Sequence, residues 1–317
     1  MQPQSLFTFS VSPCQLLVSR FFPGIELWVK RDDLLHPQVS GNKFRKLKYP
    51  LQQLAGRSPT LVTMGGAWSN HLHATAHAAA LAGWSSIGLV RAAPEMQTAT
   101  LNDCRALGMQ IVPVTRDAYR VLREQTEAWR SQLASHIRAD VAVGAKTAEA
   151  DYVWLPEGGS TADALHGVAE LVDEAIAQTG FVPDSIVLAC GTGATLAGVL
   201  AGLRGRSQVV GIAALKNAAY LHDEIADLLR RAAYPAYENY ALLTEHHHGG
   251  YGKAPPVLRE FCHAFTAETG IAIEPVYTGK VLYALMQLCQ SGQWQGGKRV
   301  LMVHTGGLQG ARGFASL

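Results

Sequence analysis

The stretch SIVLACGTGATLAG, residues 185–198, joins an apolar run, a glycine-rich turn and the start of a second apolar segment. SIVLA has no polar alternation, which is typical of a parallel strand covered on both faces. Backbone N–H groups and the helix dipole at such a turn point at an anion, and the Thr192 and Thr195 hydroxyls add donors. The stretch predicts a strand, a turn and a helix with a phosphate site, and a plain tight turn is the alternative.

Two nucleotide-binding motifs do not fit this turn. Leu196 stands where the third glycine of a dinucleotide fingerprint belongs, and the next apolar run ends at Lys216 instead of an acidic residue. The turn also lacks the Gly-Lys-Ser/Thr of a P-loop. A nicotinamide-dependent enzyme is therefore a weaker alternative.

Strand and helix patterns alternate on both sides of this stretch. Because short apolar runs separated by helical segments indicate parallel, doubly wound sheets, the sequence predicts an α/β protein. The predicted strands are 26–31, 60–64, 86–90, 110–114, 152–156, 185–189, 209–215 and 299–303, and the clearest helices are 71–83, 161–180 and 283–292. Residues 234–256 are the least regular segment and predict a functional or mobile loop.

The composition indicates a globular protein with a small-molecule partner. The chain has 317 residues, 48% hydrophobic and 16% charged, and a formal net charge of +2 without a basic cluster. A nucleic-acid or membrane partner is therefore not expected. The N-terminus has neither a basic targeting region nor a membrane-spanning run, and the five cysteines have no C-x-x-C spacing. We expect free thiols and a cytoplasmic protein.

The segment SGNKFRKL, residues 40–47, offers a candidate nucleophile. If Asn42 caps a helix, Lys43 lies in its first turn, where the dipole favours the neutral amine that attacks carbonyl groups. The alternative is that Lys43, Arg45, Lys46 and Lys48 form a solvated helix face. Pro50 should end or kink this helix.

Three more segments place polar side chains at turns. In GGAWSNHLHATAH, residues 65–77, Ser69 or Asn70 caps a helix whose N–H groups suit a carboxylate or a ring hydroxyl. GGYGK and EPVYTGK each set a tyrosine, Tyr251 and Tyr277, among turn residues, and HTGGLQG follows the last strand. Structural roles are the alternative for both tyrosines. Metal binding is not expected at the His73 and His77 pair or at residues 246–248.

In this order, GNK-x-RKL, SNH, VYTGK and HTGG resemble the D-cysteine desulfhydrase and 1-aminocyclopropane-1-carboxylate (ACC) deaminase family of pyridoxal-phosphate (PLP) enzymes. The resemblance runs from about Lys30 to Gly310. It implies a tryptophan-synthase-β-like fold with PLP between two α/β domains. The large domain would comprise residues 1–46 and 160–317, and the small domain residues 47–159. It also implies a homodimer.

The resemblance further implies a set of site residues. Lys43 would form the Schiff base, Asn70 would contact the ring hydroxyl, and Thr305 would lie beside the pyridine nitrogen. The implied phosphate cradle is Gly191, Thr192, Gly193, Ala194 and Thr195, and the implied substrate side is Trp68, Ser69, Asn70, His71, Tyr251, Tyr277 and Thr278. Among these, Lys43, Ser69, Tyr251 and Tyr277 are the implied catalytic residues.

The implied reaction is a β-elimination. The Lys43 amine would remove the α-proton of a small D- or β-substituted amino acid, and loss of the leaving group would give an aminoacrylate that hydrolyses to a keto acid and ammonia. Thr278 and Thr305 resemble the desulfhydrase branch, because ACC deaminases have glutamate and leucine there. ACC deamination is therefore the second alternative. Trp68 and Glu157 depart from the family pattern and leave the natural substrate open.

A non-catalytic PLP-binding protein is the rival of another class. Such a protein would keep Lys43 and the 191–195 turn and would lose the substrate side. Since Ser69, Tyr251 and Tyr277 are all present, an enzyme is favoured.

Overall fold

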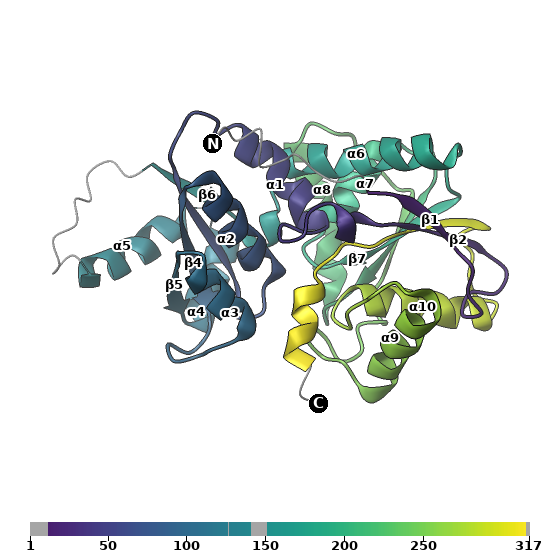
Figure 1. Cartoon of the computed structure of the whole chain (residues 1–317). Helices are drawn as coiled ribbons and strands as arrows, with labels where there is room; N and C mark the ends of the chain where they lie inside the picture. Colours follow the sequence, from purple (N-terminus) through teal and green to yellow (C-terminus); the bar gives the residue numbers. More distant parts are fainter. Residues whose placement is uncertain (1–11, 126, 141–150, 315–317) are drawn as a thin grey trace. The chain divides into compact units, whose positions relative to one another are not determined.

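The computed structural model describes residues 12–125, 127–140 and 151–314, which form two compact units (Figure 1). One unit contains Leu51–Gly159 and the other contains the described residues up to Pro50 and from Ser160 onwards. Each unit is an α/β fold built around one sheet. Across the described residues, no helix is both long and apolar enough to cross a membrane.

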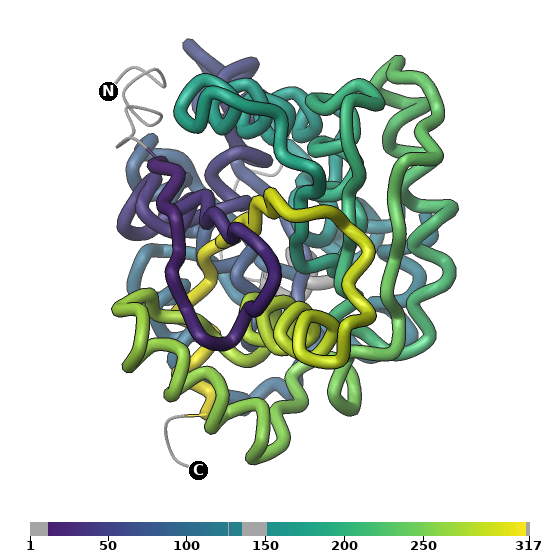
Figure 2. The backbone as a smooth tube through the Cα atoms, turned by 90° about the vertical axis from the view of Figure 1, so that its right-hand side faces the viewer, coloured from purple at the N-terminus to yellow at the C-terminus, as the bar shows by residue number. Residues whose placement is uncertain are grey.

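The larger unit contains a six-stranded sheet. Its strands follow the order β1 (Cys14–Leu17), β2 (Glu26–Lys30), β10 (Arg299–Val303), β7 (Ser185–Cys190), β8 (Gln208–Ala213) and β9 (Tyr240–Leu243). Only β1 and β2 pair antiparallel; the other neighbours are parallel. The purple β2 and the yellow β10 lie side by side although the whole chain separates them (Figure 2).

Helices cover both faces of this sheet, as Figure 1 shows. Along β7, Ile186 and Leu188 face a core that contains α6 (Ala162–Thr179), α7 (Ala194–Leu203) and α8 (Leu221–Arg231). The intervening Val187 and Ala189 face α9 (Pro256–Thr269) and α10 (Thr278–Gln290). A strand buried on both faces needs apolar side chains at every position, which explains the continuous apolar run SIVLA.

The smaller unit repeats this plan around a parallel sheet of β5 (Met109–Val114), β4 (Ser85–Arg91), β3 (Thr60–Gly66) and β6 (Tyr152–Leu155), in that order. One face packs on α2 (Asn70–Ala82) and α3 (Ala99–Ala106). The other face packs on α4 (Arg116–Glu124) and α5 (Ala128–Asp140).

The prediction of doubly wound α/β architecture is confirmed, and each of the eight predicted strands is present. Two short edge strands, β1 and β9, were not predicted. Strand β9 lies inside the segment 234–256, which is therefore only partly a loop. Of the two outcomes expected at Pro50, an end of the helix is wrong, because α1 (Asn42–Gln52) continues for two residues beyond it, and a kink stays a prediction.

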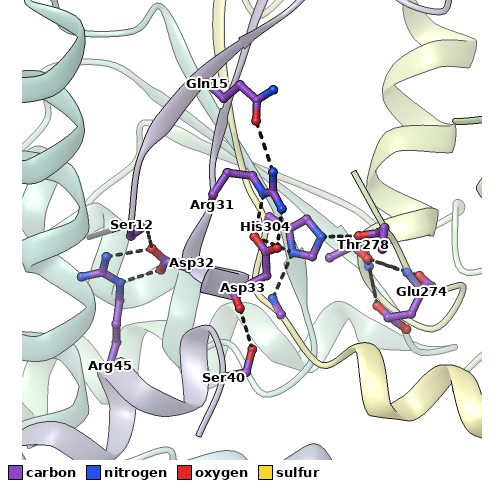
Figure 3. Close-up of polar contacts among 12 residues, drawn as sticks. Ser12, Gln15, Arg31, Asp32, Asp33, Ser40, Arg45, Glu274, Thr278 and His304 are labelled. Carbon is purple, nitrogen blue, oxygen red and sulfur yellow. Dashed lines mark hydrogen bonds and ion pairs between the residues drawn. The ribbon is translucent and has the colours of Figure 1, made fainter. Parts of the chain in front are cut away.

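A buried ionic network supports α1 (Figure 3). Arg45 donates to both carboxylate oxygens of Asp32, at 2.5 and 2.8 Å, and both side chains are almost fully buried. Arg45 also donates to Glu174 of α6 at 2.8 and 2.9 Å, and the buried Lys30 pairs with the same carboxylate at 2.9 Å. Burial alone would raise the pKa of Glu174, but the hydrogen bonds and charges of Arg45 and Lys30 lower it to about 2.

The Glu174→Gln variant should show when this network is charged. A carboxyl whose folded pKa is depressed stabilises the fold above its ordinary pKa of 4.5, and the contribution is lost as the pH falls towards 2. We expect wild type to exceed Glu174→Gln by about 2 kcal/mol in free energy of unfolding at neutral pH. The difference should shrink below pH 4.5 in urea titrations.

Asp173→Asn is the matched control, because Asp173 lies on the same helix and forms an exposed ion pair with Arg206 at 3.4 Å. It should change stability little at any pH, since exposed pairs contribute about 0–1 kcal/mol. If the difference in free energy of unfolding between wild type and Glu174→Gln does not change with pH, the lowered pKa of Glu174 is contradicted.

Candidate active site

The first turn of α1 carries Lys43 and is anchored to the loop after β10. The N–H of Asn42 donates to the carbonyl of Thr305 at 3.1 Å, and the N–H of Gly41 donates to the carbonyl of Asp32 at 3.1 Å. Gly41 has a φ of +61°, and a Cβ there would lie 1.9 Å from the Thr305 carbonyl oxygen. The backbone at Lys43 is therefore fixed by a contact that only glycine allows.

Asn42 differs in detail from the prediction. The helix begins at Asn42, so this residue is not the cap that precedes the helix. Its side-chain amide instead donates to the hydroxyl of Thr195 at 3.0 Å. Lys43 still lies in the first turn, and the bond places that turn next to the glycine-rich turn after β7.

The glycine-rich turn has the predicted strand–turn–helix form. Gly193 has a φ of +80° and precedes α7 without a side-chain cap. Thr192 accepts a hydrogen bond of 2.6 Å from Ser160. The start of α7 therefore has no competing acceptor from a cap side chain, as an anion site requires.

The two predicted tyrosines meet at this turn. A Cβ on Gly191 would lie 3.4 Å from a ring carbon of Tyr277, so the Tyr277 ring lies against the turn. The rings of Tyr251 and Tyr277 lie edge to face with centroids 6.0 Å apart. The larger unit thus connects the Lys43 helix, the glycine turn and both tyrosines through a continuous series of contacts.

Glu274 organises the start of α10 and was not singled out in the sequence. Its carboxylate is fully buried and accepts from the N–H groups of Val276, Tyr277 and Thr278 at 2.7–3.2 Å. The Thr278 hydroxyl also donates to it at 3.1 Å (Figure 3). Thr278 therefore supports the helix start, and its predicted contact with substrate stays a prediction.

The charged residues of α1 do not form a solvated face. Arg45 is 3% and Lys46 is 2% exposed, which contradicts that alternative. Burial, together with the nearby charge of Lys43, lowers the pKa of Lys46 well below its ordinary value. The sequence pattern did not predict this burial, because a lysine is expected to be exposed unless it is paired or functional.

His304 connects two loops at this end of the sheet, a structural role that the sequence did not predict. The His304 ring is fully buried, and its Nδ1 accepts from the N–H of Gly306 at 3.2 Å. Its Nε2 therefore carries the proton and donates to the Ala272 carbonyl at 2.8 Å. His304 ties the HTGG loop to the segment that leads into Glu274.

In the smaller unit, the predicted residues surround the N-terminus of α2. Ser69 is the cap and accepts from the N–H of Leu72 at 3.2 Å. The Asn70 side-chain oxygen is buried with no hydrogen-bond partner among the described residues. Trp68 is 36% exposed.

His71, next to Asn70, is fixed by Thr63. The Thr63 hydroxyl donates to the Leu155 carbonyl at 2.7 Å, so His71 Nε2, 2.8 Å away, must be the donor to Thr63. The site roles of His71, Trp68, Ser69 and Asn70 stay predictions.

Two other predicted features have structural partners. Glu157 accepts from the Tyr119 hydroxyl and pairs with Arg123 at 3.1 Å. His73 pairs with Asp103 at 3.3 Å. Among the described residues, no three His, Cys, Asp or Glu side chains form a metal-ligand group. None of the five cysteines, which all lie in the described residues, forms a disulfide bond, as predicted.

The chain belongs to the family of pyridoxal-phosphate dependent enzymes, whose family model matches residues 10–306. A putative ACC deaminase from Pyrococcus horikoshii is 30% identical over 90% of this chain and 86% of its own length. A mitochondrial bifunctional D-cysteine desulfhydrase and ACC deaminase from Arabidopsis thaliana is 28% identical over 98% of this chain and 80% of its own. The predicted family and cofactor are thereby confirmed.

A solved structure described as an ACC deaminase homologue has a TM-score of 0.80 at 27% identity, covering 97% of this chain and 92% of its own. Threonine deaminase from tomato, Solanum lycopersicum, with a TM-score of 0.64 at 14% identity, shares the fold over 95% of this chain and 81% of its own. These neighbours confirm the predicted fold of PLP enzymes.

The residues present fit PLP. The partnerless Asn70 oxygen suits a ring hydroxyl, and the uncapped start of α7 after Gly193 suits a phosphate. Lys46 adds a buried cationic side chain on the helix that carries Lys43. A buried polar atom without a partner costs about 1–3 kcal/mol, so a ligand that satisfies Asn70 stabilises the protein.

Gly41→Ala should disrupt the start of α1, because its methyl group would lie 1.9 Å from the Thr305 carbonyl oxygen. We expect a loss of about 3 kcal/mol in free energy of unfolding and at least about tenfold weaker PLP binding. Thermal unfolding and titration of the visible cofactor band measure these effects.

Gly24→Ala is the control, because Gly24 has a similar φ of +83° but no atom within 4 Å of its Cβ position. It should lose only about 1 kcal/mol and keep cofactor affinity. Equal losses in both variants would contradict the close approach at Thr305.

Proposed function

We propose that this protein is a PLP-dependent lyase that acts on a small D- or β-substituted amino acid, with D-cysteine as the first candidate. The observation that carries the proposal is the series of contacts from Thr305 through Asn42 and Thr195 to the glycine turn, Tyr277 and Tyr251. These contacts support a site in which Lys43 is the nucleophile, the glycine turn binds an anion and the two phenols serve the substrate. A protein that only binds PLP has no need of the two phenols.

Different parts of the cofactor would contact different residues. Lys43 would bind its carbonyl carbon, the turn of residues 191–195 its phosphate, and Thr305 would face its ring nitrogen. Asn70 would contact its ring hydroxyl, and Ser69 with Asn70 would receive the substrate carboxylate. The large domain would comprise residues 1–46 and 160–317 and the small domain residues 47–159, supported by compact units that divide at Pro50 and Gly159.

When bound, PLP holds the substrate amino group and withdraws electrons from the α-carbon. The Lys43 amine accepts the α-proton, and the helix N-terminus beneath it favours the neutral form that this step needs. Tyr251 and Tyr277 present hydroxyl groups for proton transfer to the leaving thiolate. The balanced reaction is D-cysteine plus water to pyruvate, ammonia and hydrogen sulfide.

ACC deamination is the second candidate, and relatives named for it support it. Its products are 2-oxobutanoate and ammonia. Thr278 and Thr305 favour the desulfhydrase, since the ACC branch of the resembled family has glutamate and leucine there. Trp68 and Glu157 depart from that pattern and favour a test of other β-substituted amino acids as well.

We also propose that the enzyme is a cytoplasmic homodimer. Five described cysteines without a disulfide bond support a reducing compartment. The homodimer rests on the family resemblance, and sedimentation velocity tests it.

The direct test compares PLP-loaded wild type, Lys43→Ala and Lys48→Ala. Wild type should release equal amounts of sulfide and pyruvate from D-cysteine, and Lys43→Ala should lose at least about a thousandfold in rate, because no other amine accepts the α-proton.

Lys48→Ala is the matched control, because Lys48 lies on the same helix and its charge pairs with Glu170 at 2.7 Å. It should retain activity. Turnover of ACC but not D-cysteine would reverse the order of the two candidates, and turnover of neither amino acid would reject both.

A further inference from the structure

Lys280 is a buried lysine that the proposed reaction does not use. Its side chain is 1% exposed and lies on the first turn of α10, three residues after Tyr277. The ammonium donates to the carbonyl of Gly250 at 2.8 Å and to the carbonyl of Ala214 at 3.2 Å. Burying an ammonium is unfavourable unless its donors are satisfied, so these two bonds allow Lys280 to be buried.

The Gly250 carbonyl begins the turn that carries Tyr251. It also accepts from the N–H of Lys253 at 3.2 Å, so Tyr251 and Gly252 are the central residues of a β-turn. Gly252 has a φ of +66°, as the third position of a type II turn requires. Tyr251 is 40% exposed, so burial fixes its ring only in part, and the backbone bonds of the turn contribute to its direction.

The Ala214 carbonyl connects Lys280 to the glycine turn. Ala214 follows β8, and its N–H donates to the carbonyl of Cys190 at 2.9 Å, directly before Gly191. Lys280 therefore touches the Tyr251 turn and the end of the sheet next to Gly191, while its own helix begins at Thr278, directly after Tyr277.

Glu274 restrains the backbone of the second tyrosine, Tyr277. Its carboxylate fixes the N–H groups of Val276, Tyr277 and Thr278, so the backbone of Tyr277 has little freedom. Burial lowers the pKa of Lys280 to about 8, and the charge of Glu274 opposes this effect. Both the ammonium and the neutral amine keep N–H donors, so the bridge does not depend on this titration.

We propose that Lys280 is a positioning residue, which sets the Tyr251 ring against the Tyr277 ring by binding the Gly250 carbonyl. The proposal rests on the proposed lyase function only for its kinetic part. Without Lys280, the turn would keep its internal bond but lose its connection to α10 and to the end of β8.

Lys280→Met tests the bridge, because methionine has similar length and no donor. In PLP-loaded protein, amide hydrogen exchange in residues 248–253 should speed up at least about tenfold, while exchange in α7 stays unchanged. Lys30→Met is the matched control, since Lys30 is equally buried and its partners are the Ser12 carbonyl and Glu174, neither of which belongs to the Tyr251 turn. Unchanged exchange at 248–253 in Lys280→Met, or equal acceleration in Lys30→Met, would overturn the proposal.

A double-mutant cycle tests whether Lys280 acts through Tyr251. Lys280→Met should lower kcat by about tenfold in wild type and by less than about twofold in Tyr251→Phe, with PLP affinity unchanged in both. Additive losses would overturn the proposal. If Lys280→Met does not fold, Lys280→Gln, which keeps amide donors, takes its place. Exchange at 248–253 as slow as in wild type, with a kcat effect that depends on Tyr251, supports the bridge. Fast exchange with kcat losses that add to those of Tyr251→Phe rejects it.

The two proposals fail in different ways. If no amino acid is turned over but exchange at 248–253 responds to Lys280→Met alone, the lyase proposal fails and the bridge stands. If D-cysteine is turned over and exchange does not respond, only the positioning role is lost.

Discussion

The buried pair of Arg45 and Asp32 determines where the candidate nucleophile lies. Both side chains are excluded from water, and removing one partner of such a pair costs about 3–5 kcal/mol, because the other charge stays buried. Arg45 lies two residues after Lys43, and its carbonyl approaches α6 so closely that a Cβ on Gly167 would lie 2.1 Å from it. The first turn of α1 is thus held by charge, by close packing and by the Gly41 contact with Thr305.

Two further buried ionisable side chains, Glu274 and Lys280, play the corresponding part near the start of α10 through bonds to backbone groups. Glu274 fixes the backbone of Tyr277, directly before α10, and Lys280 binds the turn that carries Tyr251. Buried ionisable side chains therefore fix the backbone that carries Lys43, Tyr251 and Tyr277. This is the usual requirement for precise catalysis, since a site on unsupported loops loses the geometry that accelerates the reaction.

Much of the fold followed from the sequence, because continuous apolar runs and glycine turns are local signals. All eight predicted strands and the turn after Cys190 are present. Short edge strands such as β9 were missed, since a run of four residues is too short to show a strand period. The burial of Lys46, Glu274 and Lys280 could not be predicted either: a buried charge is defined by partners distant in the chain, such as the Gly250 carbonyl for Lys280. The family motifs named candidate residues, but not the contacts that hold them.

The central claim is that Lys43, among the lysines of α1, binds the cofactor. Reduction of the PLP-loaded protein with borohydride, followed by peptide mass mapping, makes that bond permanent and locates it. The account predicts one phosphopyridoxyl group, on Lys43, and none on Lys46 or Lys48. A group on Lys46 or on Lys280, or no modified lysine at all, would contradict it.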